Sequence, residues 1–387
     1  MSAIAKTAPE ILAASAALGP QIEACADRIE ADRRLPDELV EALREAGVFR
    51  IAFPKAWGGP EMGIVDQCRL IEQLAYHDAA TAWVAMICSD SGHYAARLDE
   101  ATAREIYPDL DLLTAGFLFP AGQAVRVDGG FRVSGRWSFG SGSLHADRIV
   151  GGCFVHDGDG MVFGADGIPE MRVLWLPRDE VVVHDTWHTT GLAGTGSNDY
   201  STSDAFVPEA HAFSPFHRGP RPEALYRYHG FFFANLPAVA IGAAQRMLDE
   251  LCTLAADKVL MPSFALMKDD VRVQAALAEA SASLGAARAY QDDTLGRAVD
   301  VLERGDELRL ADRAAVGLMS VHAAQTAHRV AEQVCATVGS ASIQRAGPFD
   351  RRRRDIATIT SHIIGAERTW AIPGQLLLGT DSPFAIF

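Results

Sequence analysis

The 387-residue sequence lacks paired cysteines, a surplus of positive charge and a long uninterrupted apolar run. Its six cysteines lie far apart, without a CxxC pair or a cysteine–histidine spacing of the zinc type. They are Cys25, Cys68, Cys88, Cys153, Cys252 and Cys335. We therefore expect reduced thiols in a cytoplasmic protein, with no disulfide framework and no metal.

The formal charge of −15 repels a polyanionic backbone, so nucleic acid and anionic membranes are not expected partners. The longest nearly apolar run, residues 231–244, is shorter than the ~20 residues that cross a bilayer, and it contains Asn235 and Pro237. It predicts a buried helix. Lys6 and Pro9 interrupt the apolar core that a secretory signal would need.

Hydrophobic residues make up 49% of the chain, enough for two or three packed units. Residues 1–113 are predicted to form an N-terminal α-helical domain, since Leu39 and Leu43 recur at helical spacing and Gly47 follows them. Alternation and glycine turns then predict a central β domain over residues 114–215. It includes a hairpin that turns at residues 128–130.

Four long amphipathic segments follow and predict a C-terminal four-helix bundle over residues 216–387. The last of these segments spans residues 355–379. The predicted fold class is α+β, with helices, a β sandwich or barrel, and a helix bundle in that order.

Four motifs accompany this order. They are LPDELVEALREAGVFRIAFPKAWGG at residues 35–59, GRWSFGSGSLHAD at 135–147, GLAGTGSNDYSTSDAFVP at 191–208 and RRRRDI at 351–356. Together they resemble the acyl-CoA dehydrogenase superfamily over nearly the whole chain. The resemblance implies a flavin between the β domain and the bundle, in a homotetramer or homodimer.

A flavin site needs an aromatic face, hydroxyl or backbone donors, and cations or helix ends for phosphate. One predicted strand supplies aromatic and hydroxyl groups, and a glycine-flanked turn supplies further hydroxyls. The expected flavin contacts are Trp137, Ser138, Phe139, Ser141, Thr195 and Ser197, and the resemblance adds Phe264, Gly339 and Arg354. For Trp137, a place in the β core is the alternative.

Two of the four motifs bear on phosphate binding and on NAD binding. The arginine run at 351–354 is expected to hold either carboxylates or a flavin phosphate across a subunit contact. The GLAGTGSN turn does not follow the strand-to-helix pattern of a dinucleotide fingerprint, so NAD binding is not predicted.

The carboxylate that an acyl-CoA dehydrogenase needs as a base is missing from both positions that the resemblance indicates. Eight residues after Asp355 stands Ile363, and no acid occurs between Ile356 and Ala366. No acid occurs between Ala224 and Leu248 either.

Because it lacks this base, the chain resembles the two-component flavin monooxygenase branch of the superfamily. That branch takes reduced FMN or FAD from a separate reductase and uses O2 through a C4a-hydroperoxide to hydroxylate a small aromatic or polyketide-like substrate. The match implies catalytic roles for His362, Ser141 and His93, where a near-neutral histidine pKa would suit proton transfer.

The alternative is that His362 is a hydrogen-bonded core histidine, that Ser141 is an ordinary turn serine and that His93 is a packing residue. The other functions left open are an acyl-CoA dehydrogenase with an unrecognised base and a catalytically silent flavin-binding homologue.

Overall fold

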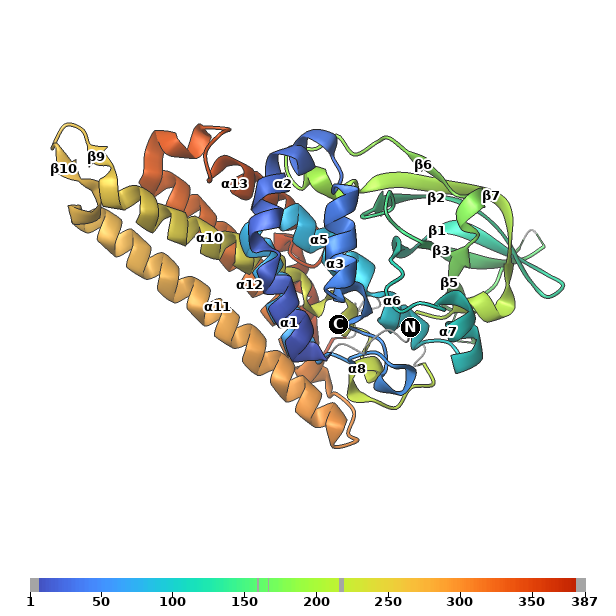
Figure 1. Cartoon of the computed structure of the whole chain (residues 1–387). Coiled ribbons are helices and arrows are strands. Elements are labelled where there is room, and N and C mark those ends of the chain that lie inside the picture. Colours follow the sequence, from blue (N-terminus) through green and yellow to red (C-terminus); the bar gives the residue numbers. More distant parts are fainter. Residues whose placement is uncertain (1–6, 159, 166, 216–218, 381–387) are drawn as a thin grey trace.

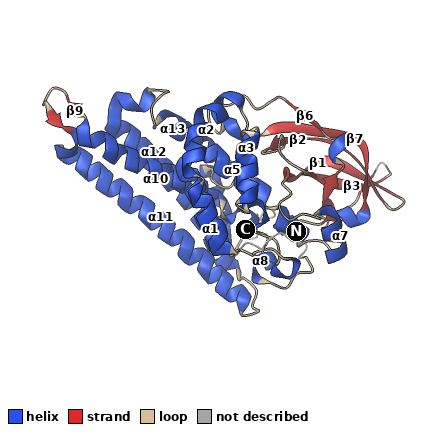
Figure 2. Cartoon of the chain, viewed as in Figure 1, coloured by secondary structure: helices blue, strands red, loops and turns tan. Residues whose placement is uncertain are grey.

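A computed structural model describes residues 7–158, 160–165, 167–215 and 219–380. Along the chain, a region of strands lies between two helical regions, and the large sheet that these strands form lies at one end of the molecule (Figures 1 and 2). This arrangement confirms the predicted α+β fold class. The first strand begins at Thr114. The predicted boundary between residues 215 and 216 adjoins residues 216–218, which lie outside the described part.

The N-terminal region consists of helices joined by short turns. They are α1 (Ala8–Ala17), α2 (Gly19–Asp32), α3 (Asp37–Glu45), α4 (Ile64–His77), α5 (Ala79–Ser89), α6 (Ser91–Ala95) and α7 (Glu100–Ile106). Helix α3 begins after Pro36 with two acids in its first turn, where the helix dipole favours negative charge. Leu39 and Leu43 are buried, and Gly47 follows in a left-handed conformation.

The strands of the central region form one twisted sheet in the order β6-β7-β2-β1-β3-β5-β8, with β4 paired to β3. They are β1 (Thr114–Val127), β2 (Gly130–Gly140), β3 (Arg148–Asp157), β4 (Gly160–Met161), β5 (Met171–Leu176), β6 (Val182–His184), β7 (Asn198–Pro208) and β8 (Ala212–Phe213). The pair β1 and β3 is parallel, and the other pairs are antiparallel. The predicted hairpin is confirmed, since Val127 pairs with Gly130 across the turn.

The C-terminal region contains the longest helices. Its elements are α8 (Ala224–Arg227), α9 (Phe231–Ala234), α10 (Leu236–Asp257), β9 (Val259–Leu260), β10 (Ala265–Leu266), α11 (Val271–Glu303), α12 (Leu310–Val338), α13 (Asp350–Ile359) and α14 (Ala371–Leu377). The stretch Phe231–Asp257 is long and apolar enough to cross a membrane, but 83% of its most apolar window is buried inside the protein. The prediction of a buried helix is confirmed.

The fourth segment of the bundle is not one continuous helix, which corrects the expectation for residues 355–379. Helix α13 ends at Ile359, and α14 begins at Ala371. The hydroxyls of Thr358, Thr360 and Ser361 all bond to backbone carbonyls three or four residues earlier. Such bonds compete with regular helical pairing. The resulting bend carries residue 362 toward the N-terminal helices.

Candidate active site

Five polar or aromatic side chains from all three regions meet in one continuous set, which we call the domain seam. Its members are Trp83 on α5, Ser141 after β2, Thr195 and Ser197 before β7, and His362 in the bend after α13. Trp83 Nε1 donates to Ser141 Oγ at 3.1 Å, and Ser141 Oγ lies 2.7 Å from Ser197 Oγ. Ser197 Oγ lies 2.7 Å from Thr195 Oγ1.

Ser141 reaches α5 because the backbone after β2 comes very close to that helix. Gly142 has a φ of 73°, and a Cβ there would stand 2.6 Å from Cys88 Sγ. Glycine is the residue that tolerates both the backbone conformation and the close approach. The Gly142 amide donates to Thr195 O at 3.0 Å, which holds the two polar turns together.

A bulge in β2 separates its two aromatic residues. The pairing of β2 with β7 shifts between Trp137 and Gly140, and Phe139 has a φ of 64°, unusual for a residue with a side chain. Trp137 is 0% exposed, whereas Phe139 is 58% exposed. Phe139 lies 6.1 Å from Phe117 and 6.2 Å from Trp187 between ring centroids. An accessible aromatic surface therefore lies next to Ser141.

Trp137 belongs to the β core, which corrects the expectation of a flavin contact through its side chain. Its Nε1 donates to Gly152 O at 2.7 Å, and its ring stacks on Tyr200 with centroids 5.3 Å apart. Ser138, the next residue, is exposed.

His362 is half-buried and packs against Trp83, with ring centroids 5.5 Å apart. The Ile364 amide donates to His362 Nδ1 at 3.2 Å, and burial lowers the pKa of His362 to about 4. The imidazole is therefore neutral at pH 7 and carries its proton on Nε2. This corrects the expectation of a near-neutral pKa. In this tautomer His362 offers a hydrogen-bond donor.

His93 lies apart from the domain seam, on α6. Its ring packs 5.1 Å from Phe232 and 6.1 Å from Tyr226, and Nε2 has no hydrogen-bond partner within the described residues. Burial, with a smaller contribution from Arg97, lowers the pKa of His93 to about 3. The structure thus brings Ser141 and His362 together through Trp83 and places His93 in a second, aromatic cluster.

The turn before β7 is held from several sides. Asn198 Oδ1 accepts from the amides of Thr186 and Trp187, which positions the Trp187 ring facing Phe139. On its other side, the Leu192 amide donates to Asp355 Oδ1 at 2.6 Å. Burial and nearby Asp78 raise the pKa of Asp355 to about 7.

The arginine run makes its ion pairs within the chain. Arg354 pairs with Glu30 at 2.6 Å and with Asp350 at 2.8 Å, and it also donates to Thr190 O. Arg351 pairs with Asp27, and Arg353 pairs with Glu332. Of the two expectations for this run, these contacts favour carboxylates, which here belong to the same chain.

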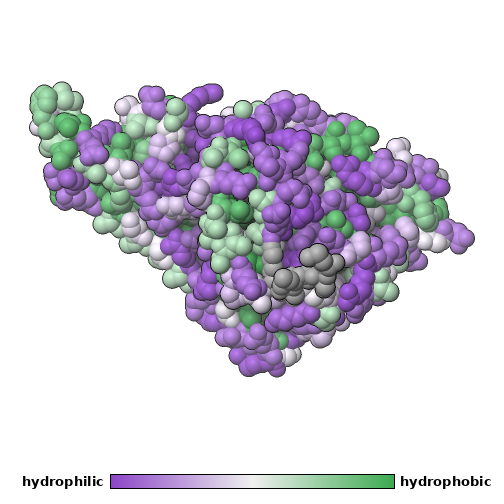
Figure 3. Space-filling view, viewed as in Figure 1, coloured by the Kyte–Doolittle hydropathy of each residue, from purple (hydrophilic) through white to green (hydrophobic). Residues whose placement is uncertain are grey.

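The tip formed by β9 and β10 lies at the end of the bundle far from the large sheet (Figure 1), and Phe264 belongs to this tip. Phe264 is 73% exposed at the β9–β10 tip, where Figure 3 shows hydrophobic surface. Lys258 Nζ donates to Val338 O, which keeps Gly339 beside this tip. Neither residue lies near the domain seam of its own chain.

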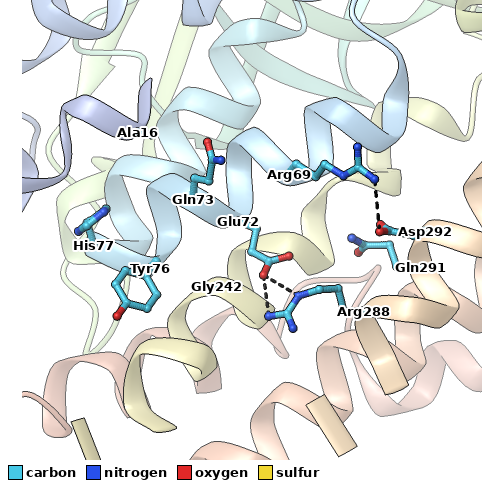
Figure 4. Close-up of a pocket in the computed structure, with 10 residues that line it drawn as sticks. All are labelled: Ala16, Arg69, Glu72, Gln73, Tyr76, His77, Gly242, Arg288, Gln291 and Asp292. Atoms are coloured by element: carbon cyan, nitrogen blue, oxygen red, sulfur yellow. Dashed lines mark hydrogen bonds and ion pairs between the residues drawn. The ribbon is translucent and has the colours of Figure 1, made fainter. Parts of the chain in front are cut away.

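A separate pocket of about 390 Å³ lies between α4, α10 and α11, and Figure 4 shows the residues that line it. Arg288 pairs there with Glu72 at 2.7 Å, and Arg69 Nη2 lies 3.8 Å from Asp292. None of the predicted site residues lines it, so it is distinct from the domain seam.

The residues at the seam suit a flavin. An accessible aromatic surface stands beside a buried hydroxyl that still has acceptor capacity, which are the features that a flat ring with a polar edge requires. No cluster of three metal-ligating side chains occurs in the described ranges.

Sequence reasoning missed Trp83. It is the one aromatic residue in the small-residue stretch AATAWVAMICS, which was the available signal.

Two family models match this chain: the acyl-CoA dehydrogenase N-terminal domain over residues 13–101 and the acyl-CoA dehydrogenase C-terminal domain over residues 235–366. The indole-3-acetate monooxygenase of Pseudomonas putida is 31% identical over 382 residues, 95% of each chain. The HsaA monooxygenase of M. tuberculosis has a TM-score of 0.88 at 26% identity, over 99% of this chain and 100% of its own.

A third similar protein, XiaF from Streptomyces sp., was solved in complex with FADH2 and glycerol. It has a TM-score of 0.89 at 24% identity and covers 97% of this chain and 96% of its own. At that identity the likeness shows the fold.

Proposed function

Because the chain belongs to the acyl-CoA dehydrogenase family and is a flavin-dependent monooxygenase of its two-component branch, we propose that it hydroxylates a small aromatic molecule at the domain seam. The observation that supports this site most directly is the contact chain from Ser141 through Trp83 to His362. It joins the Ser141 hydroxyl, which lies next to the accessible ring of Phe139, to the imidazole N–H of His362.

The proposed cofactor is reduced FMN or FAD, delivered by a separate reductase. Reduced flavin supplies two electrons, and O2 supplies the oxygen atom that a hydroxylation consumes. Phe139 would face the ring, and Ser141 would lie at flavin N5. His362 Nε2–H would hold an oxygen that gains negative charge, such as that of a phenolate. Ser138, exposed beside Phe139, is a further flavin contact in this proposal.

We place the substrate between the domain seam and the cluster around His93. His93, Tyr226 and Phe232 are buried aromatic side chains, suited to the face of an aromatic ring. The relative from P. putida is named for activity on indole-3-acetate, which is a small aromatic compound.

We also propose a cytoplasmic homo-oligomer, tetrameric or dimeric. Since Phe264 and Gly339 lie far from the seam of their own chain, in an oligomer they would contact the flavin of a neighbouring subunit. The exposed apolar tip around Phe264 supports this assignment.

The test supplies the purified protein with a flavin reductase, NADH, FMN or FAD, and a panel of phenols and indoles under ¹⁸O2. We expect oxygen consumption and one labelled oxygen atom in the product. Anaerobic bleaching of bound flavin by an acyl-CoA, without labelled product from any aromatic compound, would contradict the proposal.

A further inference from the structure

The hydroxyls of the domain seam form a chain whose hydrogen-bond direction is determined at one end. That end is Thr195, whose Oγ1 lies 2.8 Å from Leu192 O. Two oxygens at this distance need a hydrogen between them. A backbone carbonyl has none to give, so the Thr195 hydroxyl must donate its single hydrogen to Leu192 O.

This first hydrogen bond fixes which hydroxyl donates in each of the next two. Because the Thr195 hydrogen is used, the 2.7 Å contact between Thr195 and Ser197 takes its hydrogen from Ser197. For the same reason, the 2.7 Å contact between Ser197 and Ser141 takes its hydrogen from Ser141. Each of the three hydroxyls thus donates toward Leu192.

At the other end, Ser141 becomes an acceptor. Its hydrogen points to Ser197, and Trp83 Nε1 donates to one of its lone pairs at 3.1 Å. A hydroxyl oxygen has two lone pairs, so one remains. A group that binds this remaining lone pair of Ser141 therefore has to bring a hydrogen of its own.

The terminal carbonyl is held firmly. Leu192 has a φ of 50°, a left-handed conformation that costs energy for a residue with a side chain. Its amide donates to Asp355, and its oxygen also accepts from Trp187 Nε1 at 2.9 Å. Ser141, Thr195 and Ser197 are all buried, so bulk water does not compete for their hydrogens.

We propose that Thr195 and Ser197 are positioning residues that make Ser141 an acceptor and thereby select reduced over oxidised flavin. Reduced flavin carries a hydrogen on N5 and donates, whereas oxidised flavin has a lone pair there and needs a donor. This inference rests on the proposed location of flavin N5 at Ser141. It goes further by assigning the choice of redox state to residues that do not touch the flavin.

The experiment measures dissociation constants of reduced flavin, under anaerobic conditions, and of oxidised flavin by equilibrium dialysis, with FMN and FAD in turn. In the wild-type protein we expect reduced flavin to bind at least about tenfold more tightly, the effect of one ordinary hydrogen bond. Thr195→Val removes the last hydroxyl. Ser197 can then donate to Ser141, which frees the Ser141 hydrogen for N5. The ratio of the two constants should fall about tenfold.

Two variants control for structural damage. Thr195→Ser restores a hydroxyl and should restore the wild-type ratio. Thr202→Val makes the same change at a buried threonine of β7, whose hydroxyl donates to Glu180 O outside the chain of hydroxyls, and should leave the ratio unchanged.

The failures are distinguishable. If neither form of flavin binds the wild-type protein, or if Ser141→Ala changes neither constant, the proposed flavin site is wrong. If Ser141→Ala weakens the binding of reduced flavin but Thr195→Val leaves the ratio of the two dissociation constants unchanged, the proposed flavin site stands. The proposed direction of the hydroxyl hydrogen bonds is then wrong. A wild-type protein that binds oxidised flavin as tightly as reduced flavin would also overturn the inference.

Discussion

The core of the β domain and the domain seam share strand β2, yet they differ in how their polar groups are used. In the core, Trp137 donates to Gly152 O, and the Tyr200 hydroxyl donates to Val150 O and accepts from the Phe117 amide. Each of these polar groups has its partner. In the seam, Ser141 retains a free lone pair next to the exposed ring of Phe139, and His362 packs against Trp83 with its Nδ1 bonded to the Ile364 amide and its Nε2–H left to donate.

The difference shows how one motif, GRWSFGSGS, serves both stability and binding. Buried polar groups that are fully hydrogen-bonded stabilise a fold. A buried donor or acceptor without a partner costs free energy until a ligand supplies that partner. The change of role occurs within four residues, at the bulge around Phe139.

The largest effect is expected in the core. Trp137→Ala should lower the free energy of unfolding by about 3–5 kcal/mol, the usual cost of emptying a buried tryptophan site. Urea unfolding checks this value. Phe206→Ala, on the exposed side of β7, is the matched control and should cost little. A loss below about 1 kcal/mol would mean that Trp137 is not a core residue.

His362→Ala tests the chemistry of the seam. Product formation should fall about 100-fold, the usual loss when one hydrogen-bond donor to a developing negative charge is removed, while flavin affinity stays within twofold. Because the pKa of His362 is about 4, its titration should add no limb to the pH–rate profile between pH 5.5 and 8. His211→Ala is the control. Unchanged turnover would remove His362 from the mechanism.

His93→Phe tests whether the second cluster binds substrate. The unpartnered Nε2 of His93 is expected to meet a polar group of the substrate, so KM should rise about tenfold for the loss of one hydrogen bond, with kcat within twofold. If KM is unchanged and the protein is more stable, His93 is a packing residue.

The smallest effect is expected at Phe139. Phe139→Gly removes the aromatic surface and relieves the positive φ, so reduced flavin should bind about fivefold more weakly. The free energy of unfolding should stay the same or rise by up to about 1 kcal/mol. A loss of stability comparable to that of Trp137→Ala would erase the distinction between the two residues.

Much of the fold followed from local pattern. Helical spacing, the turn at Asp128 and Gly129, and the apolar run at 231–244 all predicted the elements that the structure contains. The fourth bundle segment was the exception. Its apolar spacing looked continuous, but hydroxyl bonds to the backbone break it near Thr360.

The site was predicted in part. Ser141, Ser197 and Thr195 do lie together, and His362 joins them through Trp83, which the motifs did not indicate. Strand alternation would place Phe139 on the same face as Trp137, whereas the bulge turns it outward. Arg354, expected to contact the flavin, forms ion pairs with Glu30 and Asp350 within the chain, which spacing along the sequence did not indicate.

The sequence by itself determined the order of the three regions and the absence of a carboxylate base, because both depend on residue type and spacing along the chain. The tertiary structure alone decided the tautomer of His362, the outward turn of Phe139 and the direction of the hydroxyl chain. Those properties depend on which atoms stand within hydrogen-bond distance across elements far apart in sequence, and spacing along the chain carries no such information.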